Sequence, residues 1–214
     1  MATHTVKQGE HLARIAHDHG FADFRPLWDH PQNAALKDKR TSPHILLPGD
    51  VVFIPDKEAK EESAATEQRH RFRVHGRPLV LRLQLLGFGH QPLADTPCEL
   101  HLGGAVHSLT TDGEGRIEQA IPATADSGIL IFQDPLVPFE VAIPLKIGHL
   151  DPITEPSGQK ARLRNLGYNP GSLTADDAQP FAIAVQEFQC DHGLQVTGEV
   201  DAATRDKLEQ VHGC

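Results

Sequence analysis

The chain is poor in aromatic residues and in cysteine. Its 214 residues include one Trp, one Tyr and nine Phe. Carbohydrate sites usually need flat aromatic surfaces, so this scarcity argues against tight sugar binding. The three cysteines, Cys98, Cys190 and Cys214, are odd in number and widely spaced, which excludes a disulfide framework and suits a reducing compartment.

Basic charge and long apolar runs are also lacking. The chain has 20 Lys and Arg against 29 Asp and Glu, a formal net charge of −9. Contact with phosphates needs clustered Lys and Arg, so we expect no nucleic-acid partner. No stretch of about 18 apolar residues is present, so we expect no membrane span. The first residues carry neither the basic and apolar segments of a secretion signal nor a lipobox cysteine, so we expect a cytoplasmic location unless another route exports the chain.

The sequence offers no recognised catalytic or metal-binding pattern. It contains 14 His, but a zinc site needs three or four convergent ligands, and no segment has such spacing. Cys98 falls on the apolar face of a predicted strand, and Cys190 lies beside His192 at the end of a predicted helix, so neither position indicates a nucleophile. No glycine-rich phosphate loop follows a predicted strand. We therefore expect a non-enzyme with no catalytic residue, no metal and no cofactor.

Residues 1–56 predict a first domain in the order strand, helix, helix, strand. The run 5–9 suits a short strand and turn, and apolar residues from Leu12 onward then recur at helical spacing. A second short helix is predicted over 33–40. The β-branched run 51–54, ended by proline, predicts the last strand.

This domain resembles a LysM domain. The matching runs are Thr5-Val6-Lys7-Gln8-Gly9-Glu10-His11-Leu12, Ile15-Ala16 and Pro48-Gly49-Asp50-Val51-Val52-Phe53-Ile54-Pro55. LysM domains bind N-acetylglucosamine-containing glycans through the loop after the first strand and the loop before the Pro-Gly. The resemblance therefore implies glycan or partner contacts at Gly9, Glu10, His11, Leu12, Trp28, Leu47, Pro48 and Gly49.

Both of these loops depart from the LysM pattern. Glu10-His11 replaces the usual Asp-Thr, and the span from Trp28 to Leu47 is longer than usual. The stretch from Trp28 to Pro43 looks like the LysM-like domains encoded in type VI secretion and related contractile-injection gene clusters. Such folds also serve as structural protein contacts, so a protein partner is the alternative to a glycan. Trp28 suits either the core or a ligand contact.

The middle of the chain changes to the period of a strand. Residues 57–70 are charged and lack an apolar period, which predicts a linker. From 71 to 147, apolar residues recur at every second position, as in Leu79–Leu85 and Cys98–Leu102. Asp112–Gly115 lies between two such runs and predicts a hairpin turn. Short strands at regular spacing predict a β-sandwich, and this region resembles the Ig-like or transthyretin-like repeats of secretion-spike proteins.

Residues 148–158 predict a second linker, rich in proline, before a helical domain over 159–214. Phe181, Ala184, Val185 and Phe188 lie at i, i+3, i+4 and i+7, on one face of a helix. A shorter helix is predicted over 160–167, and Asp201 can cap a third helix. The three helices predict a compact bundle.

This bundle resembles the small helical peptidoglycan-binding domain of bacterial cell-wall enzymes. The matching elements are Leu163, Leu166-Gly167-Tyr168, Ala184-Val185, Phe188-Gln189, Gly193-Leu194, Thr197-Gly198, Asp201, Thr204 and Leu208. The resemblance implies glycan or partner contacts at Tyr168, Asp177 and Phe188. The run 172–179 lacks the family's Asp-Gly and Gly-x-x-Thr elements, where glycan contacts are thought to lie, so a helical unit without a sugar site is the alternative.

Together these regions predict a multidomain α+β chain and a non-catalytic modular binding protein. One hypothesis is an accessory or effector-adaptor component of a type VI-like secretion spike, exported with that apparatus, with a spike or effector protein and peptidoglycan as partners. A second is a simple cell-wall glycan binder. A third is a cytoplasmic scaffold or effector-neutralising partner that has lost sugar binding.

Overall fold

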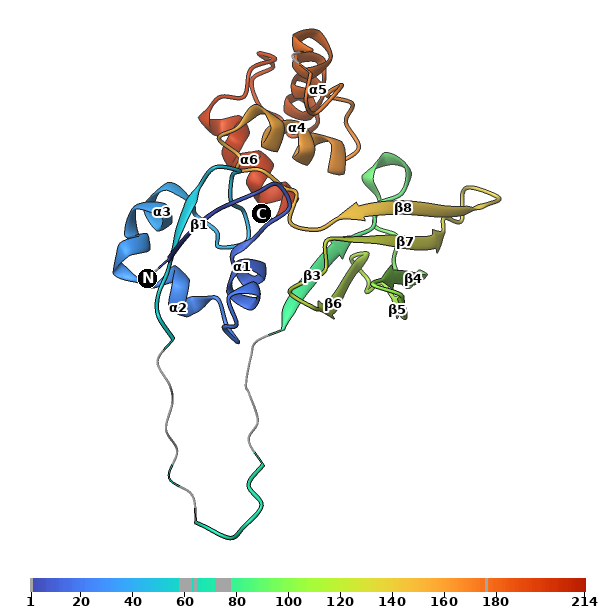
Figure 1. Ribbon diagram of the computed structural model, residues 1–214. Helices are drawn as coiled ribbons and strands as arrows, with labels where there is room; N and C mark the ends of the chain where they lie inside the picture. The colour runs from blue at the N-terminus through green and yellow to red at the C-terminus, as the bar shows by residue number, and fades with distance from the viewer. Residues whose placement is uncertain (1, 58–62, 64, 72–77, 176) are drawn as a thin grey trace. The chain divides into compact units, whose positions relative to one another are not determined.

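The computed structural model of the protein describes residues 2–57, 63, 65–71, 78–175 and 177–214 (Figure 1). The chain divides into two compact units. Unit 1 comprises Met1–His44 and Pro48–His149, and unit 2 comprises Ile45–Leu47 and Leu150–Cys214.

Helices and strands are mixed along the chain, with a sheet-rich region followed by a C-terminal helical region. This confirms the predicted α+β class. Much of the predicted linker 57–70 and the residues 72–77 at the start of the predicted sandwich lie outside the described residues. None of the described helices is long and apolar enough to cross a membrane.

Unit 1 begins with a two-stranded antiparallel sheet. β1 (Ala2–Thr5) pairs with β2 (Val51–Ile54), so that the two ends of the predicted first domain lie side by side. The connection between them contains α1 (Leu12–Asp18), α2 (Arg25–Trp28), the 3-10 turn η1 (Pro31–Asn33) and α3 (Ala34–Lys39). α3 therefore starts one residue later than the helix predicted over 33–40, because a separate turn that begins with a proline precedes it.

Two buried polar side chains hold this connection against β2. Asn33 donates to the backbone oxygens of Leu27 and Phe53 over 2.8 and 2.9 Å, and accepts from the Phe53 N–H over 2.8 Å. Arg40 donates to both carboxylate oxygens of Asp50 over 2.7 and 3.0 Å, and both side chains are 3% exposed. A bidentate pair of this kind fixes geometry as well as charge.

The rest of unit 1 consists of two sheets. In the first, β3 (Leu79–Gln84) pairs antiparallel with β6 (Arg116–Ile121). The second has the order β5-β4-β7-β8, all antiparallel. Its strands are β4 (Pro97–Leu102), β5 (Ala105–Thr110), β7 (Ser127–Gln133) and β8 (Glu140–Lys146), and the short 3-10 turn η2 (Phe88–His90) precedes them.

The alternating residues of both sheets form one core. Ile117 and Ile121 of β6 belong to the same buried cluster as Leu100 of β4 and Leu130 and Phe132 of β7. The alternation predicted from the sequence therefore places the apolar side chains on one face of each sheet, toward this core. The assignment of this region to the Ig-like or transthyretin-like class stays a prediction.

The predicted hairpin around Asp112–Gly115 is wrong, although the turn itself is present. Asp112 accepts from the backbone N–H groups of Glu114 and Arg116, each over 2.8 Å. However, the flanking strands β5 and β6 do not pair with each other, because β5 pairs with β4 and β6 pairs with β3. The turn therefore carries the chain from one sheet to the other.

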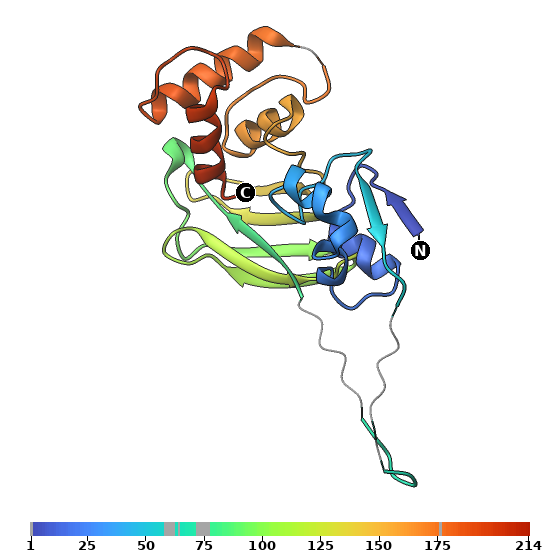
Figure 2. The ribbon, with the colours of Figure 1, turned by 90° about the vertical axis from the view of Figure 1, so that its left-hand side faces the viewer.

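Three helices make up most of unit 2, drawn in orange to red in Figures 1 and 2. They are α4 (Pro156–Asn165), α5 (Ala178–Asp191) and α6 (Ala202–His212). α4 starts four residues before the predicted Lys160, at a proline that suits the first helical position. The core contains Leu163, Tyr168, Ala184, Val185, Phe188 and Leu208.

Candidate functional site

Gln189 is the polar centre of the helical region in unit 2. Its side chain is 0% exposed, at the end of α5 that faces the α5–α6 connection. The amide nitrogen Nε2 lies 3.0 Å from Thr197 Oγ1, 2.9 Å from the Glu199 backbone oxygen and 3.0 Å from Thr204 Oγ1. The oxygen Oε1 accepts from the N–H groups of Thr197 and Gly198 over 2.8 and 3.0 Å. The Phe-Gln and Thr-Gly elements are therefore joined to each other and hold the connection to α6.

Tyr168 and Phe188 lie in the core of the same region. Phe188 is 0% exposed and Tyr168 is 9% exposed, with ring centroids 5.7 Å apart in an edge-to-face contact. The Tyr168 hydroxyl donates to Asp191 Oδ2 over 2.9 Å. Burial and this hydrogen bond raise the pKa of Tyr168 above its usual range. In this conformation both rings support the fold and leave Asp191 as the exposed group.

A buried lysine anchors the segment that precedes α5. Lys160 is 5% exposed, and its Nζ donates to the backbone oxygens of Ser172 and Ala175 over 3.2 and 2.8 Å. The same nitrogen lies 5.4 Å from the centroid of the Phe181 ring. These contacts fix the backbone of a segment that has no helix or strand of its own.

Several described residues of this segment and of the start of α5 have exposed side chains, and we call this set the loop face. Gln179 and Ile183 are four residues apart, so they share one face of α5. Ile183 is 47% exposed, which is unusual for an isoleucine on a packed helix. Asp177 is exposed before α5 and makes no side-chain cap. The loop face comprises Thr174, Ala175, Asp177, Ala178, Gln179 and Ile183.

The loop face suits a neutral, hydroxyl-rich ligand. The Asp177 carboxylate can accept hydrogen bonds, the Gln179 amide can both accept and donate them, and Ile183 offers an exposed apolar contact. Of the three candidates that the resemblance implies here, the structure places only Asp177 on this face, with Tyr168 and Phe188 in the core behind it. Sequence reasoning missed Lys160, which has no signal in the sequence apart from its place in a predicted helix.

The turn after β1 contains the candidate residues of the first domain. Gly9 is buried and has a φ of 85°, which favours glycine. Glu10 accepts from His4 Nε2 over 2.7 Å and from the Lys7 N–H over 2.9 Å. Partial burial opposes ionisation of Glu10, but these hydrogen bonds outweigh it and lower the pKa of its carboxyl. Leu12 is 0% exposed in the core.

His11 caps the first helix instead of facing solvent. Its Nδ1 accepts from the Arg14 N–H over 3.3 Å, so it replaces the hydroxyl that usually caps a helix. The imidazole is 2% exposed. Burial, together with the nearby His44 and Arg14, lowers the pKa of His11 to about 4. The ring is therefore neutral at pH 7.

The remaining candidates of the first domain are more accessible. Trp28 is half-buried at the end of α2, and Lys37 Nζ lies 5.7 Å from its ring centroid. Leu47 is half-buried, whereas Pro48 and Gly49 are exposed. The Gly49 N–H donates to the Val6 backbone oxygen over 2.9 Å, which closes the turn that leads into β2.

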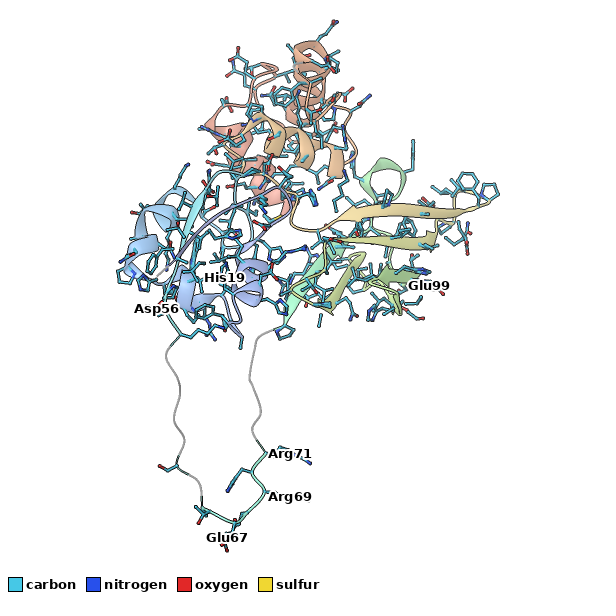
Figure 3. All side chains as sticks on the ribbon, viewed as in Figure 1. His19, Asp56, Glu67, Arg69, Arg71 and Glu99 are labelled. Carbon is cyan, nitrogen blue, oxygen red and sulfur yellow. The ribbon has the colours of Figure 1, made fainter. Side chains whose placement is uncertain are left out.

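Within the part of the chain that the structure describes, no three His, Cys, Asp or Glu side chains group in a way that could hold a metal ion. The pair of His101 Nε2 and Glu99 Oε2, 3.0 Å apart, lies on the outer side of β4, where Figure 3 labels Glu99. Two ligands on an open strand are too few for a zinc site.

A chain of hydrogen bonds links Asn165, His212 and Cys214. Asn165 Nδ2 lies 3.0 Å from His212 Nε2, and His212 Nδ1 lies 3.2 Å from Cys214 Sγ. Burial lowers the pKa of His212 to about 4 and raises the pKa of the Cys214 thiol. Both groups are therefore neutral at pH 7, whereas a reactive cysteine needs its thiolate. Cys214 is exposed, and the hydrogen bonds join the end of the chain after α6 to Asn165 at the end of α4.

Comparison with known proteins identifies one region of the chain. Residues 159–208 match the family model described as "Putative peptidoglycan binding domain". The match spans α4 to α6 and includes Gln189 with the connection that it holds. This confirms the resemblance of the C-terminal region to that family, whose domains bind and do not catalyse. No curated protein and no solved structure gives a match to the chain.

Proposed function

We propose that the protein is a non-catalytic binder of peptidoglycan and that residues 159–208 contact the glycan. The observation that carries the proposal is the family match, which runs from within α4, through α5, to within α6. The buried contacts of Gln189 support it, because they keep the motif elements in one folded arrangement. The remainder of the chain then serves other contacts, with no catalytic step.

In this proposal, the loop face is the glycan-contacting surface. Asp177 and Gln179 hydrogen-bond sugar hydroxyl or acetamide groups, and Ile183 packs against the apolar face of a sugar ring. The buried Lys160 holds the segment in place through Ser172 and Ala175. The exposure of Asp177, Gln179 and Ile183 supports this assignment, while the missing Asp-Gly and Gly-x-x-Thr elements make a helical unit without a sugar site the alternative that the experiment tests.

Co-sedimentation of the full chain with insoluble peptidoglycan sacculi tests the proposal. Ile183→Glu replaces an exposed apolar contact by a charge, so we expect the bound fraction to correspond to about tenfold weaker binding. Val196→Glu is the matched control, because Val196 is 53% exposed but follows the far end of α5. Equal retention of both variants would place the contact elsewhere, and failure of the unmodified chain to sediment would refute peptidoglycan binding.

The secretion-spike adaptor is a second candidate, favoured by an apolar tip on unit 1. Leu136 and Phe139, between β7 and β8, are 72% and 62% exposed. Gln133 Nε2 holds this tip by donating to the backbone oxygens of Val137 and Phe139 over 2.6 and 3.2 Å. Exposed apolar side chains on a fixed tip suit a protein partner such as a spike or an effector.

Export assays separate this candidate from its alternatives. An adaptor of this kind is made in the cytoplasm and leaves with the contractile apparatus. We therefore expect it in the medium of cells that have the apparatus and not in the medium of cells that lack its sheath. Detection only in the cytosol of both strains would leave the scaffold or effector-neutralising role, and export from both strains would favour the simple wall binder.

A further inference from the structure

Two glycines of unit 1 approach each other closely. Gly9 lies in the turn after β1, and Gly148 follows β8. Their φ angles are 85° and 79°. A Cβ on Gly148 would lie 2.7 Å from the backbone oxygen of Gly9 and 2.9 Å from Cδ2 of His11. Because contacts this short force atoms apart, only glycine allows the two backbones to pack in this way.

The next residue covers the same turn. A Cβ on Gly9 would lie 2.7 Å from Nε2 of His149, and Gln8 Nε2 donates to the His149 backbone oxygen over 3.4 Å. Just upstream, the Ile147 N–H donates to the Asp126 backbone oxygen over 2.8 Å, and Ile147 belongs to the sheet core. The segment is therefore anchored in the sheets before it reaches the turn.

His11 lies beneath this contact in an unusual state. Because Nδ1 accepts from Arg14, the proton of the neutral ring is on Nε2. Among the described residues, His11 Nε2 is the buried side-chain atom without a hydrogen-bond partner. A buried N–H without an acceptor is unfavourable, and opening of the contact would give it water or a ligand oxygen as a partner. The packing of the closed arrangement is thus partly offset by the hydrogen bond that His11 Nε2 would gain on opening.

We propose that Gly148 and His149 form a built-in cover over the turn Gly9–Leu12. The LysM resemblance predicts ligand contacts at this same turn, and an external ligand of the turn would have to displace the cover. The cover joins the end of β8 to the first domain and keeps His11 out of solvent. It acts independently of glycan binding by residues 159–208.

The accessibility of His11 tests the cover directly. Diethyl pyrocarbonate modifies accessible neutral imidazoles, and mass spectrometry of the full chain gives the initial rate at each histidine. The exposed His17, on the same helix, is the internal reference. We expect a low ratio of His11 to His17 modification at pH 7. In Gly148→Ala we expect this ratio to rise about tenfold, because a small decrease in the free energy of local opening raises the open population by that factor.

Gly104→Ala is the matched control. Gly104 has a φ of 84°, but a Cβ there would meet no atom within 4 Å, so this variant adds backbone strain without touching the cover. An unchanged His11 ratio in a folded Gly148→Ala variant, or an equal rise in Gly104→Ala, would overturn the proposal. If Gly148→Ala does not fold, His149→Ala removes the covering ring without backbone strain. A rise of at least about threefold supports the cover there, and no rise refutes it.

Discussion

Replacement of Gln189 by Ala is the sharpest test of how unit 2 holds its motif elements together. The change removes a 0% exposed side chain whose oxygen accepts from Thr197 and Gly198 and whose nitrogen reaches Thr204. Thr204 is 2% exposed, and its hydroxyl would lose the hydrogen bond from Gln189 but keep its hydrogen bond to the Asp201 carboxylate. The loss of this one hydrogen bond costs about 0.5–1.5 kcal/mol, and the groups of the half-exposed turn lose about 1 kcal/mol between them.

The missing side-chain atoms add a cavity term of about 1–2 kcal/mol. Alanine has the highest helix propensity and returns a few tenths of a kcal/mol. The sum is a destabilisation of about 2–4 kcal/mol for the α5–α6 region, with the larger part from the lost hydrogen bonds and the cavity. Gln189→Glu keeps the volume but buries a carboxylate with one oxygen facing the Glu199 backbone oxygen, so we expect a destabilisation at least as large as for alanine.

Hydrogen exchange of peptides from α5 and α6 measures this local stability, because slowly exchanging amides report the free energy of opening. Tryptophan fluorescence does not serve here, since the single Trp28 belongs to unit 1. Gln179→Ala is the control, an exposed glutamine at the start of the same helix, with an expected change of about 0.5 kcal/mol or less. A Gln189→Ala variant whose α5 and α6 amides stay within that range would refute the reasoning.

Two further predictions concern unit 1. The pKa of His11 is lowered to about 4 in the folded chain, below its unfolded value near 6.5. As the pH falls, the unfolded state therefore binds the proton first. The contribution of neutral His11 to the free energy of unfolding is complete above pH 6.5 and is lost as the pH falls toward 4. Urea unfolding followed by Trp28 fluorescence should show this loss, and His11→Asn, which keeps a capping side chain, should flatten it; an equal slope in both chains would contradict the assignment. Gly115→Ala should destabilise the sheets by about 2 kcal/mol or more, because its Cβ would lie 2.5 Å from the Leu85 backbone oxygen at a φ of 74°. Gly113→Ala is the control, since a Cβ there would meet no atom within 4 Å and should change stability little. Thermal melts monitored by circular dichroism compare the two variants.

The pattern of apolar residues predicts the type of each element well, since it depends on neighbours within a few residues. The face formed by Phe181, Ala184, Val185 and Phe188 is a helix in the structure, and three of these four side chains are fully buried. The same pattern also places Phe188 in the core. An aromatic ring on the apolar face of a helix is therefore a poor choice for a ligand contact, and Asp177 on the preceding loop is a better one.

The Asp112–Gly115 turn shows where local evidence fails. Its side-chain hydrogen bonds lie within four residues of Asp112, so the sequence specifies the turn. Which strands pair on either side depends on Leu85, Leu100 and Ile117 meeting in one core. Those residues are far apart along the chain, and no local signal distinguishes a hairpin from a crossing between sheets.

The sequence by itself determined the α+β class, the alternation of the strands and the elements of the C-terminal motif, because propensity, periodicity and capping act over short stretches of chain. The tertiary structure decided the strand pairing, the burial of His11 and Tyr168, and the approach of Gly148 to Gly9. These features arise from contacts between residues that are distant in the sequence. Their energies depend on packing and desolvation, which exist only once the chain has folded.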